Sequence, residues 1–447
     1  MIQINPREVA AEAMMQIMAE GAYNTVALRR LLRQNGAMQK QEKAFVTEIV
    51  NGTLRNIAYI DYVIGQFSNT KIQKIKPWLL AVLRTAVYQI LFLTVPDNAV
   101  CNEAVKLANE RGYKGLSGFV NGLLRTIARE KQNITLPEKN TAEYLHIVYS
   151  HPLWLVKMWI AYYGYAQTEA LCKANNISPD VTIRINTTQT NQTALQEMLE
   201  KEQISVQKGV LCENALHLTK TADLTKSMSF QNGLFHVQDE SSQLAAAALA
   251  PKSGQKILDI CAAPGGKSFT LAQMMENKGE VVARDIYAHK VDLIAEGAKR
   301  LGLSIVHTEV SDATVFLEKD KEAFDAVLAD VPCSCLGLLR KKPDIRLKKD
   351  GSEIDNLIPI QRKRLEQAAM DVKTGGVLLY STCTLSKKEN EKNVEWFLQN
   401  HPEYTLEDMT PYLPKQMADM GKQGYLTVFP HIHHTDGFFI ARLKKKG

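Results

Sequence analysis

Two cysteines stand at the ends of two apolar runs, where a thiol can do covalent chemistry. Cys333 follows the run 324–329 within the sequence Asp330-Val-Pro-Cys, and Cys383 follows the run 377–380 within Ser-Thr-Cys. Both runs are typical of buried strands, and the carboxyl ends of parallel strands meet at one edge of a sheet. We therefore expect the two sulfurs to face a common site, where a thiolate acts as a nucleophile.

A pyrimidine ring is a substrate that needs such a thiolate. Carbon 5 of cytosine is too poor a nucleophile to accept a methyl group, but a thiolate that adds to carbon 6 makes carbon 5 reactive. A thiol with a pKa of about 8.5 is mostly protonated at neutral pH, so we expect its surroundings to lower that pKa. Lys267 is the candidate for the positive charge, and Asp330 is the candidate for binding the N3 and amine edge of the base.

The segment 256–267, KILDICAAPGGK, predicts a strand, a glycine turn and the start of a helix. Its glycines allow close approach to a ligand, and a helix N-terminus favours a carboxylate. Asp285, which ends the next strand, is placed to bind ribose hydroxyls, and Asp312 is placed to hold an adenine edge. The loop lacks the GxGxxG pattern of dinucleotide-binding folds. The predicted cofactor-binding residues are Cys261, Ala262, Ala263, Pro264, Gly265, Gly266, Lys267, Asp285, Asp312 and Asp330.

The cysteines also allow two plainer interpretations. A single cysteine is most often a small buried hydrophobe, but two at adjacent strand ends, one of them after Asp-x-Pro, favour chemistry. A metal site would combine cysteines with histidines of the C-terminal region. The spacing of these residues matches no standard zinc pattern, so we expect no metal. The residues concerned are Cys333, Cys335 and Cys383 with His431, His433 or His434.

Residues 1–131, upstream of these motifs, have the apolar spacing of an all-helical bundle. Pro77 is placed at a helix start, where its missing N–H costs nothing. No alternating strand pattern interrupts this region. Two apolar sets recur at helical steps and predict buried faces: Leu79, Leu83, Ala86 and Ile90, and Leu116, Val120, Leu123 and Ile127.

Two further domains are predicted downstream. Residues 132–250 combine a polar linker, a helix at 154–163 and a small α+β module, in which 181–186 alternates like a half-buried strand. A short amphipathic helix there presents Leu195, Met198 and Leu199. Residues 251–447 alternate strands with helices, which predicts an α/β domain with a mostly parallel, doubly wound sheet.

The overall charge and the cysteine content bear on the binding partners and the cellular compartment of the protein. A net charge of +6 over 447 residues permits nucleic-acid binding. Seven cysteines and an N-terminus without an apolar run predict a cytoplasmic protein, and the most apolar stretch, 79–95, is too short and interrupted for a membrane span. No exposed heptad is evident, so we expect a monomer. A basic run beside the Asp-x-Pro-Cys loop is expected to contact RNA phosphates: Arg340, Lys341, Lys342, Arg346, Lys348 and Lys349.

The motifs resemble those of a known family. DICAAPGGK, ARD at Asp285, SDA at Asp312, DVPCS and STCT resemble, in this order, the motifs of RNA cytosine-5 methyltransferases. VQDESS at 237–242 and HTDGFFIA at 434–441 resemble segments before and at the end of their catalytic domain. FVNGLLR at 119–125 and the helical N-terminus resemble the antitermination factor NusB. The combination is similar to the small-subunit ribosomal RNA methyltransferases of the RsmB/NOP family over nearly the whole chain.

This resemblance implies a NusB-like RNA-binding bundle, an RRM/ferredoxin-like module and a Rossmann-like methyltransferase domain. It implies transfer of a methyl group from S-adenosylmethionine to carbon 5 of a cytosine in 16S ribosomal RNA. It also assigns roles that spacing leaves open, with Cys383 as nucleophile and Cys333 assisting product release. In DNA cytosine-5 enzymes the Pro-Cys cysteine is the nucleophile instead. The sequence departs from the family at Cys335, where Gly or Ala is usual, and at Val331, where Ala is common.

Several other functions remain open from the residues. An RNA-binding adaptor of the antitermination type would bind RNA without the methyl donor. A DNA methyltransferase is disfavoured by the Thr-Cys cysteine, and an amine methyltransferase usually carries Asn/Asp-Pro-Pro-aromatic in place of Asp330-Val-Pro-Cys333. A cytosine-5 enzyme acting on another RNA is the nearest alternative.

Overall fold

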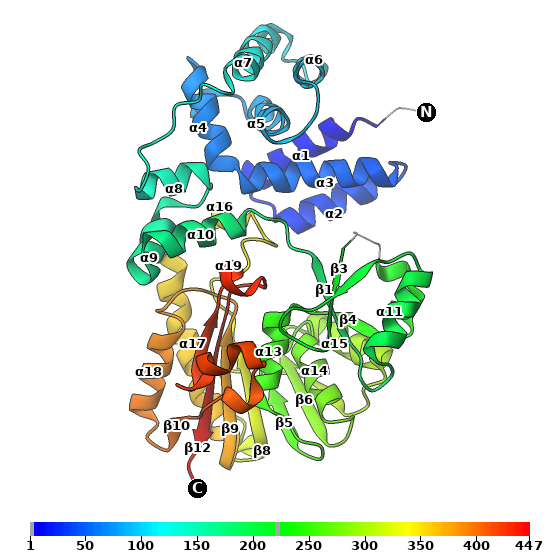
Figure 1. The fold of residues 1–447 in the computed structure, drawn as a ribbon, viewed down its shortest axis with the longest axis vertical. Helices are drawn as coiled ribbons and strands as arrows, with labels where there is room; N and C mark the ends of the chain where they lie inside the picture. The colour runs from blue at the N-terminus through cyan, green and yellow to red at the C-terminus, as the bar shows by residue number, and fades with distance from the viewer. Residues whose placement is uncertain (1–3, 220–223) are drawn as a thin grey trace. The chain divides into compact units, whose positions relative to one another are not determined.

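The computed structural model describes residues 4–219 and 224–447, and the chain divides into two compact units (Figure 1). The helical unit comprises Met1–Ile177 and Lys341–Asp350, and the sheet unit comprises Ser178–Arg340 and Gly351–Gly447. Within the two described ranges, no helix combines the length and apolarity that crossing a bilayer requires.

The helical unit has the all-α architecture that its apolar spacing predicts, since the described residues of its two segments contain helices and no strand. Two clusters of buried side chains hold it together. The helices are α1 (Pro6–Met18), α2 (Asn24–Gln34), α3 (Lys40–Arg55), α4 (Ile57–Phe67), η1 (Ile72–Lys74), α5 (Pro77–Phe92), α6 (Asp97–Glu110), η2 (Lys114–Leu116), α7 (Ser117–Glu130), α8 (Ala142–Val148), α9 (Leu153–Tyr163), α10 (Tyr165–Asn175) and α16 (Ile345–Lys348).

Helix α5 is the central helix of this unit. It begins at Pro77 as predicted, and most of its residues are buried, so neighbouring helices cover it on several sides. The face predicted for α7 is wrong at one position. Leu116 is 41% exposed, because it ends the short η2 turn before α7 begins at Ser117 and therefore leaves the periodic face.

The basic segment after Arg340 is built into the helical unit. Arg346 is 4% exposed, and its guanidinium donates to the carbonyl oxygens of Arg55, Ser150 and Asn175 at 2.7, 3.1 and 2.9 Å. Burial lowers its pKa to about 9. The prediction that Arg346 contacts RNA phosphates is therefore wrong, because backbone carbonyls already occupy the guanidinium.

A small antiparallel sheet opens the sheet unit, with strand order β2-β3-β1-β4. Strand β1 is buried on both faces over most of its length rather than half-buried, because Arg184 reaches Gln273 and Gln243 at 3.1 Å each. In the nearby helix Met198 is 42% exposed, whereas Leu195 and Leu199 are buried. The elements are β1 (Val181–Ile185), α11 (Gln192–Lys201), β2 (Val206–Lys208), β3 (Ala215–Leu218), η3 (Leu224–Lys226), α12 (Met228–Gln231) and β4 (Phe235–Val237).

The large sheet has the order β10-β12-β9-β8-β5-β6-β7, with β11 paired to β12. The five strands from β9 to β7 in this order are parallel, whereas β12 runs antiparallel to β9. The strands are β5 (Lys256–Asp259), β6 (Glu280–Asp285), β7 (Val306–Val310), β8 (Phe324–Asp330), β9 (Val372–Thr382), β10 (Tyr404–Leu406), β11 (Tyr425–Val428) and β12 (Phe438–Lys445).

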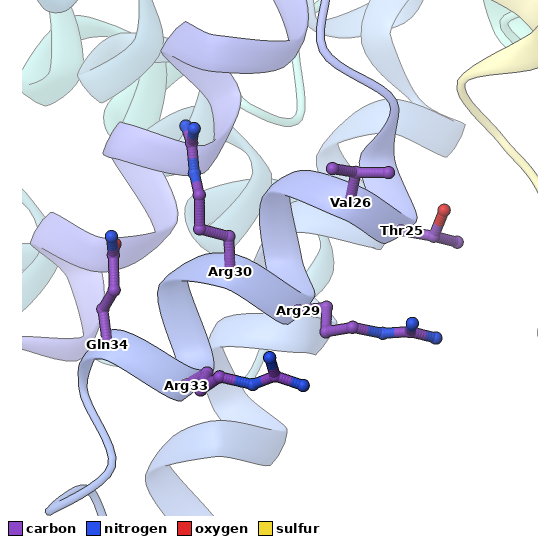
Figure 2. A pocket seen from close by; sticks show the side chains of 6 residues that line it. All are labelled: Thr25, Val26, Arg29, Arg30, Arg33 and Gln34. Atoms are coloured by element: carbon purple, nitrogen blue, oxygen red, sulfur yellow. The ribbon is translucent and has the colours of Figure 1, made fainter.

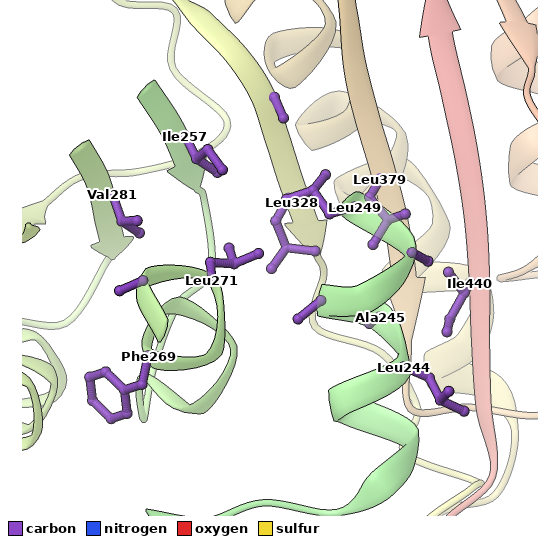
Figure 3. Close-up of a cluster of buried hydrophobic side chains, with 14 of the residues drawn as sticks. Leu244, Ala245, Leu249, Ile257, Phe269, Leu271, Val281, Leu328, Leu379 and Ile440 are labelled. Carbon is purple, nitrogen blue, oxygen red and sulfur yellow. The ribbon is translucent and has the colours of Figure 1, made fainter. Parts of the chain in front are cut away.

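Helices cover both faces of this sheet, so the predicted doubly wound fold is confirmed. One core cluster packs α13 and α14 against the strands, as Figure 3 shows for Leu244, Leu271 and Leu328. A second cluster packs α17 and α18 on the opposite face. The helices are α13 (Glu240–Leu249), α14 (Gly266–Met274), α15 (Ala288–Leu301), η4 (Glu318–Asp320), α17 (Ser352–Asp371), α18 (Glu391–Asn400), η5 (Thr410–Tyr412), η6 (Lys415–Gly421) and α19 (Pro430–His433).

Candidate active site

The two strand-end cysteines meet at the carboxyl edge of the large sheet. Strands β8 and β9 are neighbours, and their register pairs Asp330 with Ser381. The loops that follow place Cys333 Sγ 3.2 Å from Cys383 Sγ. The chain therefore brings together two thiols that are 50 residues apart in sequence.

A third thiol joins this pair. Cys335 Sγ accepts a hydrogen bond from Cys383 Sγ at 3.6 Å and donates to the Cys333 carbonyl oxygen at 3.4 Å. Cys335 has a backbone φ of +60°, in the left-handed region that favours glycine. The three sulfurs lie within 4.8 Å of one another. We call Cys333, Cys335 and Cys383 the thiol cluster.

The thiol cluster is less acidic than the sequence led us to expect. A hydrogen bond from Cys333 lowers the pKa of Cys383, but the interaction with Cys335 and burial outweigh it and hold that pKa well above the ordinary value. Hydrogen bonding to Cys335 and Cys383, together with burial, also raises the pKa of Cys333. The physical reason is that a buried thiolate beside other thiols loses hydration without gaining a fully compensating charge.

Lys267 supplies the positive charge beside these thiols. Its ammonium lies 2.6 Å from Oδ2 of Asp330, whose Oδ1 accepts a 2.8 Å hydrogen bond from the Ser381 hydroxyl. Burial lowers the pKa of Lys267, but the charge and hydrogen bond of Asp330 outweigh it, so this pKa stays above its ordinary value. Lys267 is therefore cationic at neutral pH, and Asp330 is held in one orientation.

Glu389 links the two cysteine loops and was not found by the sequence analysis. Its carboxylate accepts hydrogen bonds from the backbone N–H and hydroxyl of Ser334 at 2.8 and 2.6 Å, and from Gln361 at 3.0 Å. The Ser334 hydroxyl also lies 2.6 Å from that of Thr384. Burial raises the pKa of Glu389. Nothing in the polar segment SKKEN singles out this glutamate, because its partners Ser334 and Gln361 come from two other segments.

The C-terminal motif packs against the same loops. Gly437 N–H donates to the Gly337 carbonyl at 2.9 Å, and Gly337 N–H donates to the Cys383 carbonyl at 3.0 Å. A Cβ on Gly337 would lie 1.9 Å from the Gly437 carbonyl oxygen, so a side chain has no room there. The motif 434–441 therefore fixes the backbone that carries Cys383.

The predicted glycine loop connects β5 to α14. Gly265 has a φ of +103°, and a Cβ there would meet the Phe269 ring at 2.3 Å, so both conformation and packing require glycine. Asp259, a further residue missed from the sequence, accepts from the Ser268 hydroxyl at 2.7 Å and steadies the loop. Burial raises the pKa of Asp259 to about 7. The turn itself consists of Cys261, Ala262, Ala263 and Pro264.

The next two strand ends carry the other predicted cofactor residues. Asp285 Oδ1 accepts from the Tyr287 N–H at 3.2 Å, and Asp312 is held by the N–H of Thr314 at 2.9 Å. Hydrogen bonds from Thr314 lower the pKa of Asp312, which keeps it ionised. Apolar side chains beside these acids are unusually exposed, with Ile286 at 45% and Val310 at 58%. Acids for hydroxyls and amines next to exposed apolar surface fit a nucleoside.

The histidines considered as metal ligands lie apart from the thiols. Nδ1 of His433 accepts a 2.9 Å hydrogen bond from the Phe429 N–H. Within the described parts of the chain, the group of potential ligands around the sulfurs consists of the three cysteines and includes no histidine.

Comparison with known proteins extends over the whole chain. The family model for 16S rRNA methyltransferase RsmB/F matches residues 246–444, the NusB family model matches 4–129, and a ferredoxin-like domain of RsmF/B-like methyltransferases matches 151–225. These matches confirm the expected combination of folds. A Bacillus subtilis (strain 168) protein described as a probable ribosomal RNA small subunit methyltransferase B is 40% identical over 99% of both chains. A Synechocystis relative with the same description is 36% identical over 99% of this chain and 100% of its own.

Two solved structures share the fold. The crystal structure of PH0851 superposes with a TM-score of 0.81 at 30% identity, covering 99% of this chain and 100% of that one. NSun6 from Pyrococcus horikoshii, solved with SFG, superposes with a TM-score of 0.57 at 24% identity, covering 65% and 97%. The chain therefore belongs to the RsmB/F family of 16S ribosomal RNA methyltransferases, for which S-adenosylmethionine is the methyl donor.

Proposed function

We propose that this methyltransferase modifies carbon 5 of a cytosine in 16S ribosomal RNA through a covalent adduct between Cys383 and carbon 6 of the base. The observation that carries the proposal is the 3.2 Å approach of Cys333 and Cys383 beside the Lys267–Asp330 ion pair. Amine methylation requires no thiol, whereas this site presents thiols next to a carboxylate that suits a pyrimidine edge.

The cofactor loop is proposed to hold the methyl donor, which supplies an electrophilic methyl group when bound. The N-terminus of α14, which begins at Gly266, is assigned to the amino acid carboxylate, because a helix N-terminus favours a negative group. Asp285 is assigned to the ribose hydroxyls and Asp312 to the adenine edge. The other assigned residues are Cys261, Ala262, Ala263, Pro264, Lys267 and Asp330.

The residues at the carboxyl edge of the large sheet have different roles in the proposed reaction. Cys383 passes its proton to solvent and forms the bond from sulfur to carbon 6, N3 of the ring takes up a proton from solvent, and Asp330 accepts hydrogen bonds from the amine and the protonated N3. Carbon 5 then takes the methyl group and its proton passes to a base. The bond from sulfur to carbon 6 breaks, and N3 returns its proton to solvent. Cys333, 3.2 Å from the leaving sulfur, assists release by hydrogen bonding to the departing thiolate.

Lys267 keeps positive potential beside the reacting sulfur and orients Asp330. The ligand-free structure raises the pKa of Cys383, so we expect the thiolate to form only when substrate and methyl donor complete the site. These reaction steps require no resident metal ion. One chain carries all the residues that take part in them, so a monomer is sufficient. Reduced thiols and a ribosomal RNA substrate suit the cytoplasm.

A surface of the helical unit is proposed to bind the RNA backbone. A hollow on α2 is lined by Thr25, Val26, Arg29, Arg30, Arg33 and Gln34. In Figure 2 the side chains of Arg29 and Arg33 extend to the same side, whereas those of Arg30 and Gln34 point away from them. No acid is among the described residues that line it. Three guanidinium groups without a lining carboxylate suit phosphates, and such contacts position RNA without reading its sequence. The target base must leave its stack to reach a thiol, which favours a loop in the RNA.

The experiment that tests the proposal compares two cysteine variants with 16S RNA and labelled methyl donor. Cys383→Ala is expected to abolish both methylation and any protein–RNA adduct on a denaturing gel. Cys333→Ala is expected to accumulate the adduct, because release is impaired. Interchanged results would reverse the two roles, and full activity of the double variant would overturn the adduct mechanism. Mapping the product base separates carbon 5 from other positions, and other RNAs serve as substrate controls.

A further inference from the structure

The thiol cluster contains one more sulfur than the proposed reaction uses. Cys383 and Cys333 have roles in adduct formation and release, whereas Cys335 has none. All seven cysteines of the chain are outside disulfides, so the three thiols are available to a ligand. Cys333 is buried, and Cys335 and Cys383 are partly exposed, so an ion can reach the cluster from solvent.

We propose that the thiol cluster is a binding site for a soft, thiophilic metal ion of the Zn²⁺ or Cu⁺ class, which reversibly blocks methylation. The site goes beyond the proposed function, because it needs neither RNA nor methyl donor. Binding takes the nucleophilic sulfur out of the reaction by placing it in the coordination shell.

The distances between the sulfurs suit such an ion. A zinc ion with Zn–S bonds of about 2.3 Å in tetrahedral directions places its sulfurs about 3.8 Å apart. In the thiol cluster two distances are 3.2 and 3.6 Å, and all sulfurs lie within 4.8 Å of one another. To reach about 3.8 Å, the pair at 3.2 Å must open by about 0.6 Å and the third distance must change by no more than about 1 Å, which side-chain rotation can provide.

The ligand chemistry and charge also fit. Thiolates select Cu⁺ and Zn²⁺ over hard ions such as Mg²⁺. Each thiol releases its proton to solvent on coordination, so three thiolates and one Zn²⁺ carry a net charge of −1. The ammonium of Lys267 interacts electrostatically with Cys383 but already pairs with Asp330 at 2.6 Å, so it offsets that charge only in part. A fourth position stays open for water, as in zinc sites with three protein ligands.

Cys335 supplies the third sulfur ligand of the proposed site. Its backbone conformation indicates which substitution removes that sulfur without disturbing the loop. At a φ of +60° glycine is free of strain, so Cys335→Gly removes the sulfur and keeps the loop conformation. Cys101→Ala is the matched control, since Cys101 is a buried thiol of the helical unit. Cys101→Ala is expected to keep wild-type methylation in metal-free buffer. Because Cys335 helps to raise the pKa of Cys383, the inhibition of each variant by metal is measured relative to its own metal-free rate.

The experiment titrates the reduced, metal-free full chain with Zn²⁺ against a chromophoric chelator under anaerobic conditions. The wild type and Cys101→Ala are expected to bind one Zn²⁺ per chain at the cluster, and Cys335→Gly to bind it at least about 100-fold more weakly. Cd²⁺ in place of Zn²⁺ reports the site by sulfur-to-metal charge-transfer absorption, which Cys335→Gly should lose. Methylation by the wild type should be inhibited by Zn²⁺ and restored by chelator, with Cys335→Gly at least about 10-fold less sensitive.

Equal Zn²⁺ affinity of the wild type and Cys335→Gly, or no Zn²⁺ bound by the folded wild type, overturns the proposal. Metal binding is measured without RNA, so its failure is distinct from a failure of the methylation mechanism. Conversely, a Cys383→Ala variant that still methylates RNA would contradict the mechanism while leaving the metal site to its own titration.

Discussion

The Lys267 ammonium lies 2.6 Å from Asp330 Oδ2, and the two residues come from different strand ends of the large sheet. Lys267 lies in the first turn of α14, which follows β5, whereas Asp330 is the last residue of β8. This ion pair joins the cofactor loop to the strand that leads into the thiol cluster. It therefore couples the two halves of the proposed site.

Replacing Lys267 with methionine is expected to lower kcat for methylation by about 100-fold, because a positioned charge beside the reacting groups is lost. Single-turnover methyl transfer measures the effect. In a Cys333→Ala background the rate of adduct formation should fall in parallel. Ser381→Ala removes only a neutral hydrogen bond to the same carboxylate and should cost about 10-fold or less. Equal losses in the two variants would argue against a charge effect.

Glu389→Ala is expected to lower the free energy of unfolding by about 2 to 4 kcal/mol, because several buried donors lose their acceptor. Denaturant unfolding measures it. As a positioning residue, Glu389 should affect kcat more than KM for RNA, since the cysteine loops lose their mutual orientation. Glu389→Gln keeps one acceptor oxygen and should recover part of the free energy of unfolding and part of kcat. A large rise in KM with kcat unchanged would place the residue in RNA binding instead.

Asp259 gives stability a defined pH dependence. Its pKa rises from 3.8 to about 7 on folding, mainly through burial, so the folded state binds more protons than the unfolded state between these values. The stability that Asp259 contributes is therefore present below pH 3.8 and is lost as the pH rises towards 7. Asp259→Asn should raise Tm relative to the wild type more at pH 8 than at pH 5, both being chosen to bracket the folded pKa of about 7.

The control for Asp259 is Ser268→Ala, which removes a hydrogen bond that lowers the Asp259 pKa. It should increase the loss of stability with rising pH. Identical Tm differences between the wild type and Asp259→Asn at the two pH values would show that this carboxyl does not change its protonation on folding.

Replacing Arg29, Arg30 and Arg33 together with alanine is expected to weaken RNA binding by about 10-fold or more at about 0.15 M salt and to flatten its salt dependence by about 2 to 3 units of slope. Filter binding at several salt concentrations measures both. Methylation at saturating RNA should keep its kcat, because none of the three arginines belongs to the proposed catalytic set. Arg129→Ala is the control, since this arginine is 71% exposed and pairs with Glu130. If the affinity of the triple variant for RNA depends on salt concentration as strongly as that of the wild type, the hollow is not part of the RNA interface.

Local patterns in the sequence were sufficient to predict the helices, the strands and the positions of the motifs. The start of α5 at Pro77 and the alternation of strands and helices after residue 251 follow from periodicity and backbone preferences of neighbouring residues. The position of Asp330 and Cys383 at strand ends follows in the same way, since it depends on where an apolar run stops.

Long-range packing decided the rest. Arg346 lies in a basic run whose composition predicts solvent exposure. In the fold its guanidinium is buried and donates to carbonyl groups up to 291 residues away in sequence. Glu389 gains its role from partners on two other segments, and Cys335 becomes part of a three-sulfur cluster only when the loops after β8 and β9 meet. A side chain's neighbours across a fold depend on how layers pack, and one-dimensional spacing carries no information about that packing.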